Sequence, residues 1–312
     1  IEFDSAGICG EVIKTVKTKI GMRSDAECFA IYEVMGSSER CMSHDERLSD
    51  TVSKWERLSR SGAVRDLKLL FKKRLFVEPY VNSSDPVECD LLFNQLIEDV
   101  FEQRIPITHK EAVHLCALKV QSEIEDMKAG EIDYTSVMRI LPRDMRSTVR
   151  PEEVATTHKT VLDMSPHQAI ISFINLLRSW HLFGTTVFAV SQTYTSTMPK
   201  SLLLGIHQRG IYLLELDTFR VMSSYSFSDI VHSSPAIKSI MIVIGHVAKG
   251  IKFMFNTNEA TQIAQLIKDY MEEMQARYTL TPTEQSHTLS ADFEIDELER
   301  QNSEIQAAEI YH

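Results

Sequence analysis

"LFKKRLFVEPYVNSSDPVECDLLFNQLIEDV", residues 70–100, runs from a basic apolar segment through a polar turn into a strongly patterned helix. Asp85 can cap that helix, which opens with Pro86, and Glu88 stands three residues after the cap, as a capping box requires. The helix carries a broad apolar stripe made of Val87, Leu92, Phe93, Leu96, Ile97, Val100 and Phe101. The stretch therefore predicts the boundary between a unit that ends in a strand and a helical unit.

The segment before this boundary mixes strand and helix patterns. Strands are predicted at 1–7 and 28–34, and helices at 5–22 and 48–58. This order makes most of a small ubiquitin-like roll. Only one strand precedes the first helix, so we expect the chain to start inside its first unit.

The segment after the boundary, residues 85–180, reads as helix throughout. Thr108 with Glu111, and Ser165 with Gln168, form two further capping boxes. Helices are predicted after the first one at 106–124, 133–141, 150–162 and 165–180. This unit is predicted to be a compact all-helical domain.

Beyond Gly184 the period changes to that of strands. Six strand candidates occupy 185–194, 201–208, 210–216, 220–227, 239–245 and 250–257. One long helix follows at 259–278, with Ile263, Ile267, Tyr270 and Met274 on a single face. A curled antiparallel sheet closed by one terminal helix is the predicted arrangement.

Composition sets the broad class. At 312 residues the chain has room for two or three domains of the usual size, roughly 100 to 150 residues each. Its 43% hydrophobic and 25% charged residues are typical of soluble globular proteins. No apolar run approaches the roughly 20 residues that cross a bilayer, and no signal peptide is evident, so we expect an intracellular protein or a fragment of a larger one. The five cysteines are scattered without a C-x-x-C pair, which favours reduced thiols.

The net charge of -11 argues against nucleic-acid binding, which needs a basic surface. Residues 279–312 contain eight acidic residues and one basic residue, Arg300, and so carry -7 of this charge. We predict that this acidic tail is a flexible linker.

The three units in this order resemble a FERM domain. The resemblance rests on residues 70–100, on "GTTVFAVSQTYTSTMPKSLLLGIHQRGIYLLE" at 184–215 and on "MIVIGHVAKGIKFMFNTNEATQIAQLIKDYMEEM" at 241–274. It implies an α+β fold with three lobes: a ubiquitin-like roll truncated at its start, an acyl-CoA-binding-protein-like helical bundle, and a barrel like pleckstrin-homology and phosphotyrosine-binding modules. The implied bounds are 1–80, 81–183 and 184–278, with the tail at 279–312.

The sequence of these stretches is most similar to FERM modules in the tails of unconventional myosins of classes seven and fifteen. The resemblance implies a cytoplasmic protein-binding adaptor at the cytoskeleton, in the cell cortex or protrusions. Its partners would be cytoplasmic peptides of membrane or adaptor proteins, with actin reached indirectly through the parent motor. No motor motif is present in these residues.

Catalytic motifs are not evident. The sequence contains no H-E-x-x-H, G-x-S-x-G, Walker or G-x-G-x-x-G motif, and no cofactor is predicted. His109, His114 and Cys116 share one helix, but with no further ligand nearby their spacing favours helix surface and core over a metal or nucleophile site. We therefore expect a module without enzymatic activity.

The FERM resemblance implies where a peptide would bind. In the third lobe, target peptides commonly lie between the fifth strand and the terminal helix, where they extend the sheet. The matching residues are Ile230, Val231, His232, Ser233 and Ser234 in the strand, and Gln262, Gln265, Leu266, Asp269, Tyr270 and Glu273 in the helix. Asp269 and Glu273 would favour a ligand with basic flanks, while Leu266 and Tyr270 are also consistent with core positions.

The competing function is attachment to phosphoinositide membranes, which needs clustered basic residues. The densest basic run spans residues 65–74. Within it, the residues expected to contact acidic lipids are Lys72, Lys73 and Arg74. A solvated strand edge is the other interpretation of the same residues. A third role, in which the tail folds back on a motor head, is equally compatible with the sequence.

Overall fold

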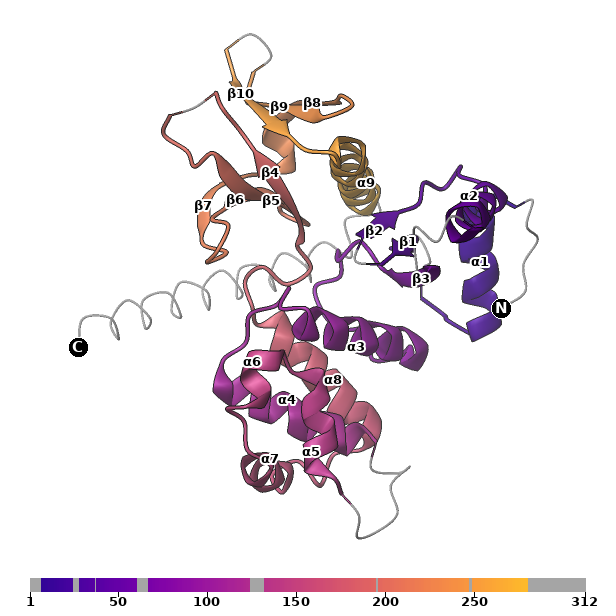
Figure 1. The fold of residues 1–312 in the computed structure, drawn as a ribbon, viewed down its shortest axis with the longest axis vertical. Coiled ribbons are helices and arrows are strands. Elements are labelled where there is room, and N and C mark those ends of the chain that lie inside the picture. The colour runs from indigo at the N-terminus through magenta and orange to yellow at the C-terminus, as the bar shows by residue number, and fades with distance from the viewer. Residues whose placement is uncertain are drawn as a thin grey trace.

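A computed structural model describes residues 7–24, 28–36, 38–60, 67–123, 132–194, 196–246 and 249–279. The elements form three lobes, in chain order a mixed lobe, a helical lobe and a strand-rich lobe (Figure 1). The predicted α+β architecture is therefore confirmed. None of the helices in the described ranges combines the length and the apolar character that crossing a bilayer requires.

The first lobe packs helices on a small sheet. It comprises α1 (Cys9–Ile20), β1 (Phe29–Met35), β2 (Ser38–Cys41), α2 (Leu48–Arg60) and β3 (Leu67–Lys73). The sheet order is β2-β1-β3, with β1 antiparallel to both neighbours. The strand β2 was not predicted, because "SERC" is short and polar. The strand predicted at 1–7 lies, apart from Gly7, outside the described residues.

The second lobe is helical, as predicted. It comprises α3 (Pro86–Phe101), α4 (His109–Ser122), α5 (Tyr134–Val137), a 3-10 turn (Met138–Ile140), α6 (Arg143–Arg146), α7 (Pro151–His158) and α8 (Pro166–Arg178). Both boxes after the first, at Thr108 and Ser165, have their two reciprocal hydrogen bonds. The box predicted at Asp85 is only half formed. Asp85 accepts hydrogen bonds from Val87 and Glu88, but the Glu88 side chain turns toward Lys73 instead of back to the cap.

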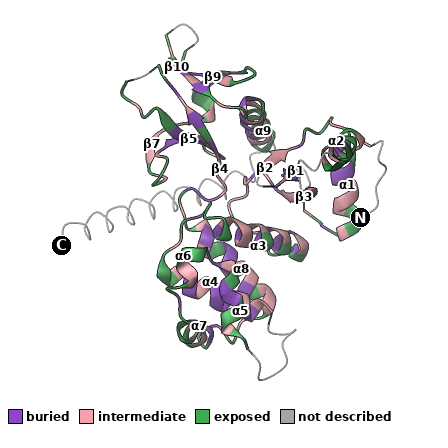
Figure 2. Ribbon diagram, viewed as in Figure 1, coloured by how far each residue is buried: buried purple, intermediate pink, exposed green. Residues whose placement is uncertain are grey.

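The third lobe is a seven-stranded antiparallel sheet closed by a helix. Its elements are β4 (Thr186–Ser191), β5 (Ser201–His207), β6 (Gly210–Leu214), β7 (Val221–Tyr225), a 3-10 turn (Phe227–Asp229), β8 (Ile230–Pro235), β9 (Ser239–Ile244), β10 (Ile251–Asn256) and α9 (Ala260–Thr279). The strand order is β7-β6-β5-β4-β10-β9-β8. The six strands predicted from periodicity are present, and β8 is a seventh. Figure 2 shows that the central strands of this sheet contain many buried residues.

The lobes are packed against one another. One apolar cluster contains buried residues of both the first and the third lobe. A second, smaller cluster joins Leu182, in the segment after α8, to the outer face of the third sheet through Leu203 and Leu214. Gly184 lies in this connection with φ +74°, and a Cβ there would stand 2.6 Å from the Phe76 side chain. Glycine is therefore required where the segments from the first and second lobes cross.

Candidate functional site: the β8 edge and the faces of α9

The strand predicted to pair with a peptide lies at the edge of the sheet. Among the strands that the structure describes, β8 pairs with β9 alone, so within these residues its other side is open. A bulge interrupts the pairing between Ile230 and His232, and Pro235 ends the strand. Natural edge strands are often shortened by bulges and proline in this way, which limits uncontrolled pairing.

The five predicted strand residues differ in exposure. Ile230 is 7% exposed and belongs to the core that the first and third lobes share. Val231, in the bulge, is 39% exposed, and His232 is also exposed. Ser233 and Ser234 are half-buried. A charged substitution at Ile230 would disrupt the core itself, so only the residues after it can test a surface role.

Two of the predicted helix residues lie in the core. Leu266 is 2% exposed and Tyr270 is fully buried. The Phe76 backbone N–H donates to the Tyr270 hydroxyl at 3.2 Å, and this hydroxyl donates to the Gly184 carbonyl at 3.5 Å. Burial raises the pKa of Tyr270, which keeps the hydroxyl neutral. Tyr270 therefore joins the third lobe to the segments that enter from the other two lobes.

The polar helix residues face the first lobe. The Cys41 backbone N–H donates to Gln262 Oε1 at 3.3 Å, and Arg74 forms an ion pair with Asp269. Gln265 donates to Asp269 at 2.7 Å. Because Asp269 is already matched by Arg74, it does not supply the negative charge that was expected to favour basic ligands.

Glu273 is also paired within the protein. Its carboxylate lies 2.8 Å from the Arg277 guanidinium, which also lies 3.6 Å from Glu78. Gln262, Asp269 and Glu273 therefore occupy one flank of α9, the flank that meets the first lobe. The residues at i, i+4 and i+7 on the opposite flank are Ala264, Lys268 and Met271. Met271 is 38% exposed, and Lys268 pairs with Glu272 at 3.5 Å.

The three predicted lipid-binding cations form ion pairs inside the fold. Lys72 pairs with Glu39 and lies 4.4 Å from the centre of the Tyr32 ring. Lys73, 5% exposed, lies 2.8 Å from Glu78 and 2.6 Å from Glu88. Arg74 pairs with Asp269, as described above. The strand edge of the other interpretation is present, because β3 ends the sheet order β2-β1-β3. The three cations are nevertheless not solvated, because carboxylates of β2, α3 and α9 pair with Lys72, Lys73 and Arg74.

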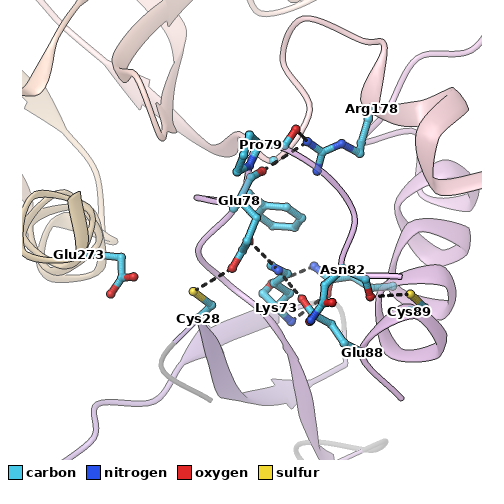
Figure 3. Close-up of polar contacts among 12 residues, drawn as sticks. Cys28, Lys73, Glu78, Pro79, Asn82, Glu88, Cys89, Arg178 and Glu273 are labelled. Atoms are coloured by element: carbon cyan, nitrogen blue, oxygen red, sulfur yellow. Dashed lines mark hydrogen bonds and ion pairs between the residues drawn. The ribbon is translucent and has the colours of Figure 1, made fainter. Parts of the chain in front are cut away.

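Figure 3 shows the junction around Lys73, the one of these three cations that it labels. Burial opposes the charge on Lys73, but Glu78 and Glu88 outweigh it, so the pKa of Lys73 is raised. Arg178 of α8 donates to the carbonyl oxygens of Pro79 at 2.6 Å and Glu78 at 3.3 Å. A small cavity between these residues has room for little more than one water molecule. Such a junction holds lobes together and offers no space for a substrate.

Sequence reasoning missed this junction. The charged residues that meet there come from β3, the connecting segment, α3 and α8, so no local spacing connects them. The one signal available was a basic run inside an apolar strand pattern, which both a solvated strand edge and a lipid-binding surface could explain.

The candidate metal and nucleophile residues are not assembled into a site. Cys116 is fully buried, and burial raises its thiol pKa to about 12. His109 lies 3.3 Å from Glu153 on the surface. In the part of the chain that the structure describes, no three histidine, cysteine or carboxylate side chains cluster as metal ligands.

Family models match three consecutive parts of the chain. The model described as "RA like domain" matches residues 1–75, "FERM central domain" matches 78–188, and "PTB domain (IRS-1 type)" matches 188–275. Their order is that of the three lobes in the structure.

Curated relatives include talins and myosins. Talin-A of Dictyostelium discoideum is 24% identical over 274 residues, which is 86% of this chain and 10% of that protein. Unconventional myosin heavy chain 6 of Caenorhabditis elegans is 22% identical over 291 residues, 87% of this chain and 14% of that protein. The chain thus spans only a small part of these relatives.

Solved structures show the same fold. The MyTH4-FERM MF2 domain of Dictyostelium discoideum myosin VII (mutant 1) has a TM-score of 0.70 and 18% identity, covering 88% of this chain and 57% of that one. The human myosin 7b C-terminal MyTH4-FERM domain, solved with the harmonin-a PDZ3 domain, has a TM-score of 0.67 and 15% identity, with coverage of 88% and 57%. The Drosophila Merlin FERM and C-terminal domain complex has a TM-score of 0.70 and 16% identity, with coverage of 89% and 93%. Three family models in the order of the three lobes, together with this shared fold, identify the chain as a FERM domain.

Proposed function

We propose that this FERM domain is a non-enzymatic adaptor that binds extended peptide segments between β8 and α9. The observation that carries the proposal is the open edge of β8 beside a helix that packs against it. A strand edge offers main-chain hydrogen bonds, and a neighbouring helix offers side-chain contacts, which is the usual combination for strand addition.

The contacts of α9 indicate which of its residues line this groove. Tyr270 binds the carbonyl of Gly184, which leads into β4, and the start of β4 pairs with the end of β5. Phe76, in the segment that leaves the first lobe, binds the same Tyr270 hydroxyl, and α9 packs against β5, so we place the first lobe on the β5 side of α9. Since α9 also packs against β8, we place the flank with Ala264, Lys268 and Met271 on the β8 side of the helix. We define the peptide groove as Val231 and Ser233 of β8 together with these three residues.

The chemistry of the groove favours apolar ligand side chains. Val231 and Met271 are both more than one-third exposed, and methionine adapts readily to different partners. The two acids once expected to select basic ligands, Asp269 and Glu273, are matched by Arg74 and Arg277. A basic flank is therefore not a requirement for the proposed ligand.

The similar proteins support a wider cellular role for this domain. The myosin 7b structure contains a PDZ domain as a protein partner, and talin and myosin relatives match most of this chain. We infer that the parent protein is an unconventional myosin whose tail uses this module to hold membrane-protein or adaptor peptides. It would work in the cytoplasm, at the cortex or in protrusions, and would connect its cargo to actin. We favour peptide binding over the membrane-lipid alternative, because Lys72, Lys73 and Arg74 are paired within the fold.

Peptide binding tests the groove directly. Peptides selected from a random display library against the unmodified domain serve as probes, and their Kd is measured by fluorescence anisotropy. Val231→Glu and Met271→Glu each place a charge in the groove and should weaken binding at least about tenfold. Leu216→Glu, at a 46% exposed position in the β6 to β7 turn, is the control that should change nothing. Unchanged affinity in both groove variants would remove the proposal.

A further inference from the structure

We propose that the backbone of Ser233 fixes the register of any peptide that adds to β8. This inference rests on the proposed groove and goes beyond it, because it assigns the hydrogen-bonding position and the chemistry of the ligand residue there. It depends on which main-chain groups of the strand point away from β9.

The pairing of β8 with β9 gives the direction of each group. The Ala236 N–H donates to the Ser239 carbonyl at 2.7 Å, so this pair is hydrogen-bonded. In an antiparallel ladder such pairs recur at every second residue. With Ser234 opposite Met241 and His232 opposite Val243, these two residues bond toward β9. Ser233, opposite Ile242, therefore points its N–H and C=O off the edge of the sheet.

The other β8 positions offer no regular outward backbone N–H to a peptide, for three different reasons. The Ile230 N–H donates to the Phe227 carbonyl in the preceding turn. Val231 is the extra residue of the bulge, where regular outward pairing is lost. Pro235 has no N–H, although its carbonyl can still accept. In β8, every residue of which is described, Ser233 thus provides the single regular outward donor.

One donor is enough to set which alternate residues of the ligand pair with β8. A ligand residue that exchanges both main-chain bonds with Ser233 runs antiparallel to β8, and the residue two positions away can donate to Pro235. A slip by one residue would turn the N–H and C=O groups of the ligand away from Ser233 and move its apolar side chain off the inner face of the sheet. The choice among alternate ligand residues then belongs to the apolar side chain, and the pairing itself is lost when the Ser233 N–H is removed.

The same geometry predicts which ligand side chain enters the groove. Ser233 shares a face with Ile242, which is fully buried, so its side chain is on the inner face of the sheet. A ligand residue paired with Ser233 places its side chain on that face too, beside the flank with Ala264 and Met271. The fitting partner is an extended peptide with an apolar residue at this position and polar residues on either side of it.

A matched pair of variants tests the assignment. Ser233→Pro removes the N–H, whereas Ser233→Ala keeps the N–H and removes only the hydroxyl. With the library-selected peptides as probes, Ser233→Pro should weaken binding about tenfold or more, as expected for loss of one main-chain hydrogen bond and its register. Ser233→Ala should bind within about threefold of the unmodified domain. Equal affinity of the two variants would overturn the assignment.

A second measurement uses the unmodified protein and so does not depend on whether Ser233→Pro folds. Each peptide is N-methylated at one backbone nitrogen at a time. Affinity should fall at two nitrogens spaced two residues apart, those that donate to Ser233 and Pro235, and tolerance at every nitrogen contradicts the assignment. If Met271→Glu abolishes binding while Ser233→Pro and the N-methyl scan have no effect, the groove stands and the register fails. If none of the three has an effect, both proposals fail.

Discussion

Lys73 is the residue on which the contacts between the first and second lobes converge. Its ammonium lies between Glu78 and Glu88 at 2.8 and 2.6 Å, and the Gln95 amide of α3 exchanges hydrogen bonds with its backbone N–H and C=O, both at 2.9 Å. Glu88 is buried and depends on this cation, whereas Glu78 is partly exposed and also lies 3.6 Å from Arg277. Removing it leaves negative charge in a place that water reaches poorly.

Lys73→Ala should lower the free energy of unfolding by about 3 kcal/mol, because breaking a buried ion pair leaves its partners uncompensated. Lys68→Ala, on the same strand but at an exposed position, should change it by less than about 0.5 kcal/mol. Urea unfolding followed by circular dichroism gives both values. Equal effects of the two substitutions would show that the junction does not stabilise the fold.

His207 makes the third lobe sensitive to acid. It is 5% exposed, and burial together with the nearby Arg209 lowers its pKa to about 4. The unfolded chain has the ordinary histidine pKa of about 6.5, so between these values it binds more protons than the folded protein. The stabilisation is complete above about pH 6.5 and is lost as the pH falls toward about 4, a difference of roughly 3 kcal/mol.

This pH dependence is expected to weaken in His207→Gln. Urea unfolding at several pH values between 6.5 and 4 measures it. His109→Gln, at a surface position, is the control and should keep the slope of the unmodified domain. A slope that is unchanged in His207→Gln would assign the acid sensitivity to other groups.

Residue roles were predictable only where they depend on near neighbours. The Thr108 and Ser165 capping boxes follow from a spacing of three residues and are confirmed. The ion pair of Arg74 with Asp269 joins residues 195 positions apart, and no local pattern contains it. For this reason Arg74 and Asp269 were assigned to ligands, although they are matched by each other.

Among the helices, α3 is anchored to the first lobe through its N-cap residue, Asp85. Asp85 caps the helix with Oδ1, while Oδ2 accepts the backbone N–H groups of Arg23 at 2.6 Å and Ser24 at 2.7 Å in the first lobe. These bonds lower the pKa of Asp85 against the effect of its burial. The cap therefore also holds the loop that follows α1.

Asp85→Ala should lower the free energy of unfolding by more than the loss of a helix cap alone. Removing Ser165, which caps only α8, is expected to cost about 1 kcal/mol. Asp85→Ala also leaves two first-lobe donors without an acceptor, so we expect a loss of about 3 kcal/mol. Thermal and urea unfolding of Asp85→Ala and Ser165→Ala compare them. Equal losses would contradict the second role of Asp85.

Helices and strands were predicted correctly where the apolar period continues over many residues. They were missed where local geometry interrupts that period. The helices of the second lobe and the six periodic strands could be predicted from their apolar spacing. β8 has no clear alternation, because its bulge and Pro235 interrupt the two-residue period. It could be located only through the family resemblance, and the helix flank beside it only from the structure.

At the scale of the whole molecule, the first and third lobes share one core. The same cluster contains Phe29 of β1 and Phe255 of β10, and Tyr270 lies fully buried within it. Contacts of this kind should make the two lobes unfold together. The helical lobe has two clusters of its own and is expected to respond less.

Tyr270→Phe tests this coupling, because it removes only the hydroxyl that contacts Phe76 and Gly184. A loss of about 1 to 2 kcal/mol is expected. Hydrogen exchange should show a similar decrease in opening free energy in β1 and β10, and a smaller one in α4. Tyr225→Phe, at a half-buried position in β7, is the control. A decrease confined to the third lobe would show that the lobes are independent.

Hydrogen exchange with and without a library-selected peptide at saturating concentration shows where on the domain the peptide binds. If peptides add to the β8 edge beside α9, exchange should slow at Ser233 and in α9 around Met271, while β7, the other edge of the sheet, does not change. Protection of β7 or of the first lobe, with β8 exchanging at its free rate, would mean that peptides bind elsewhere.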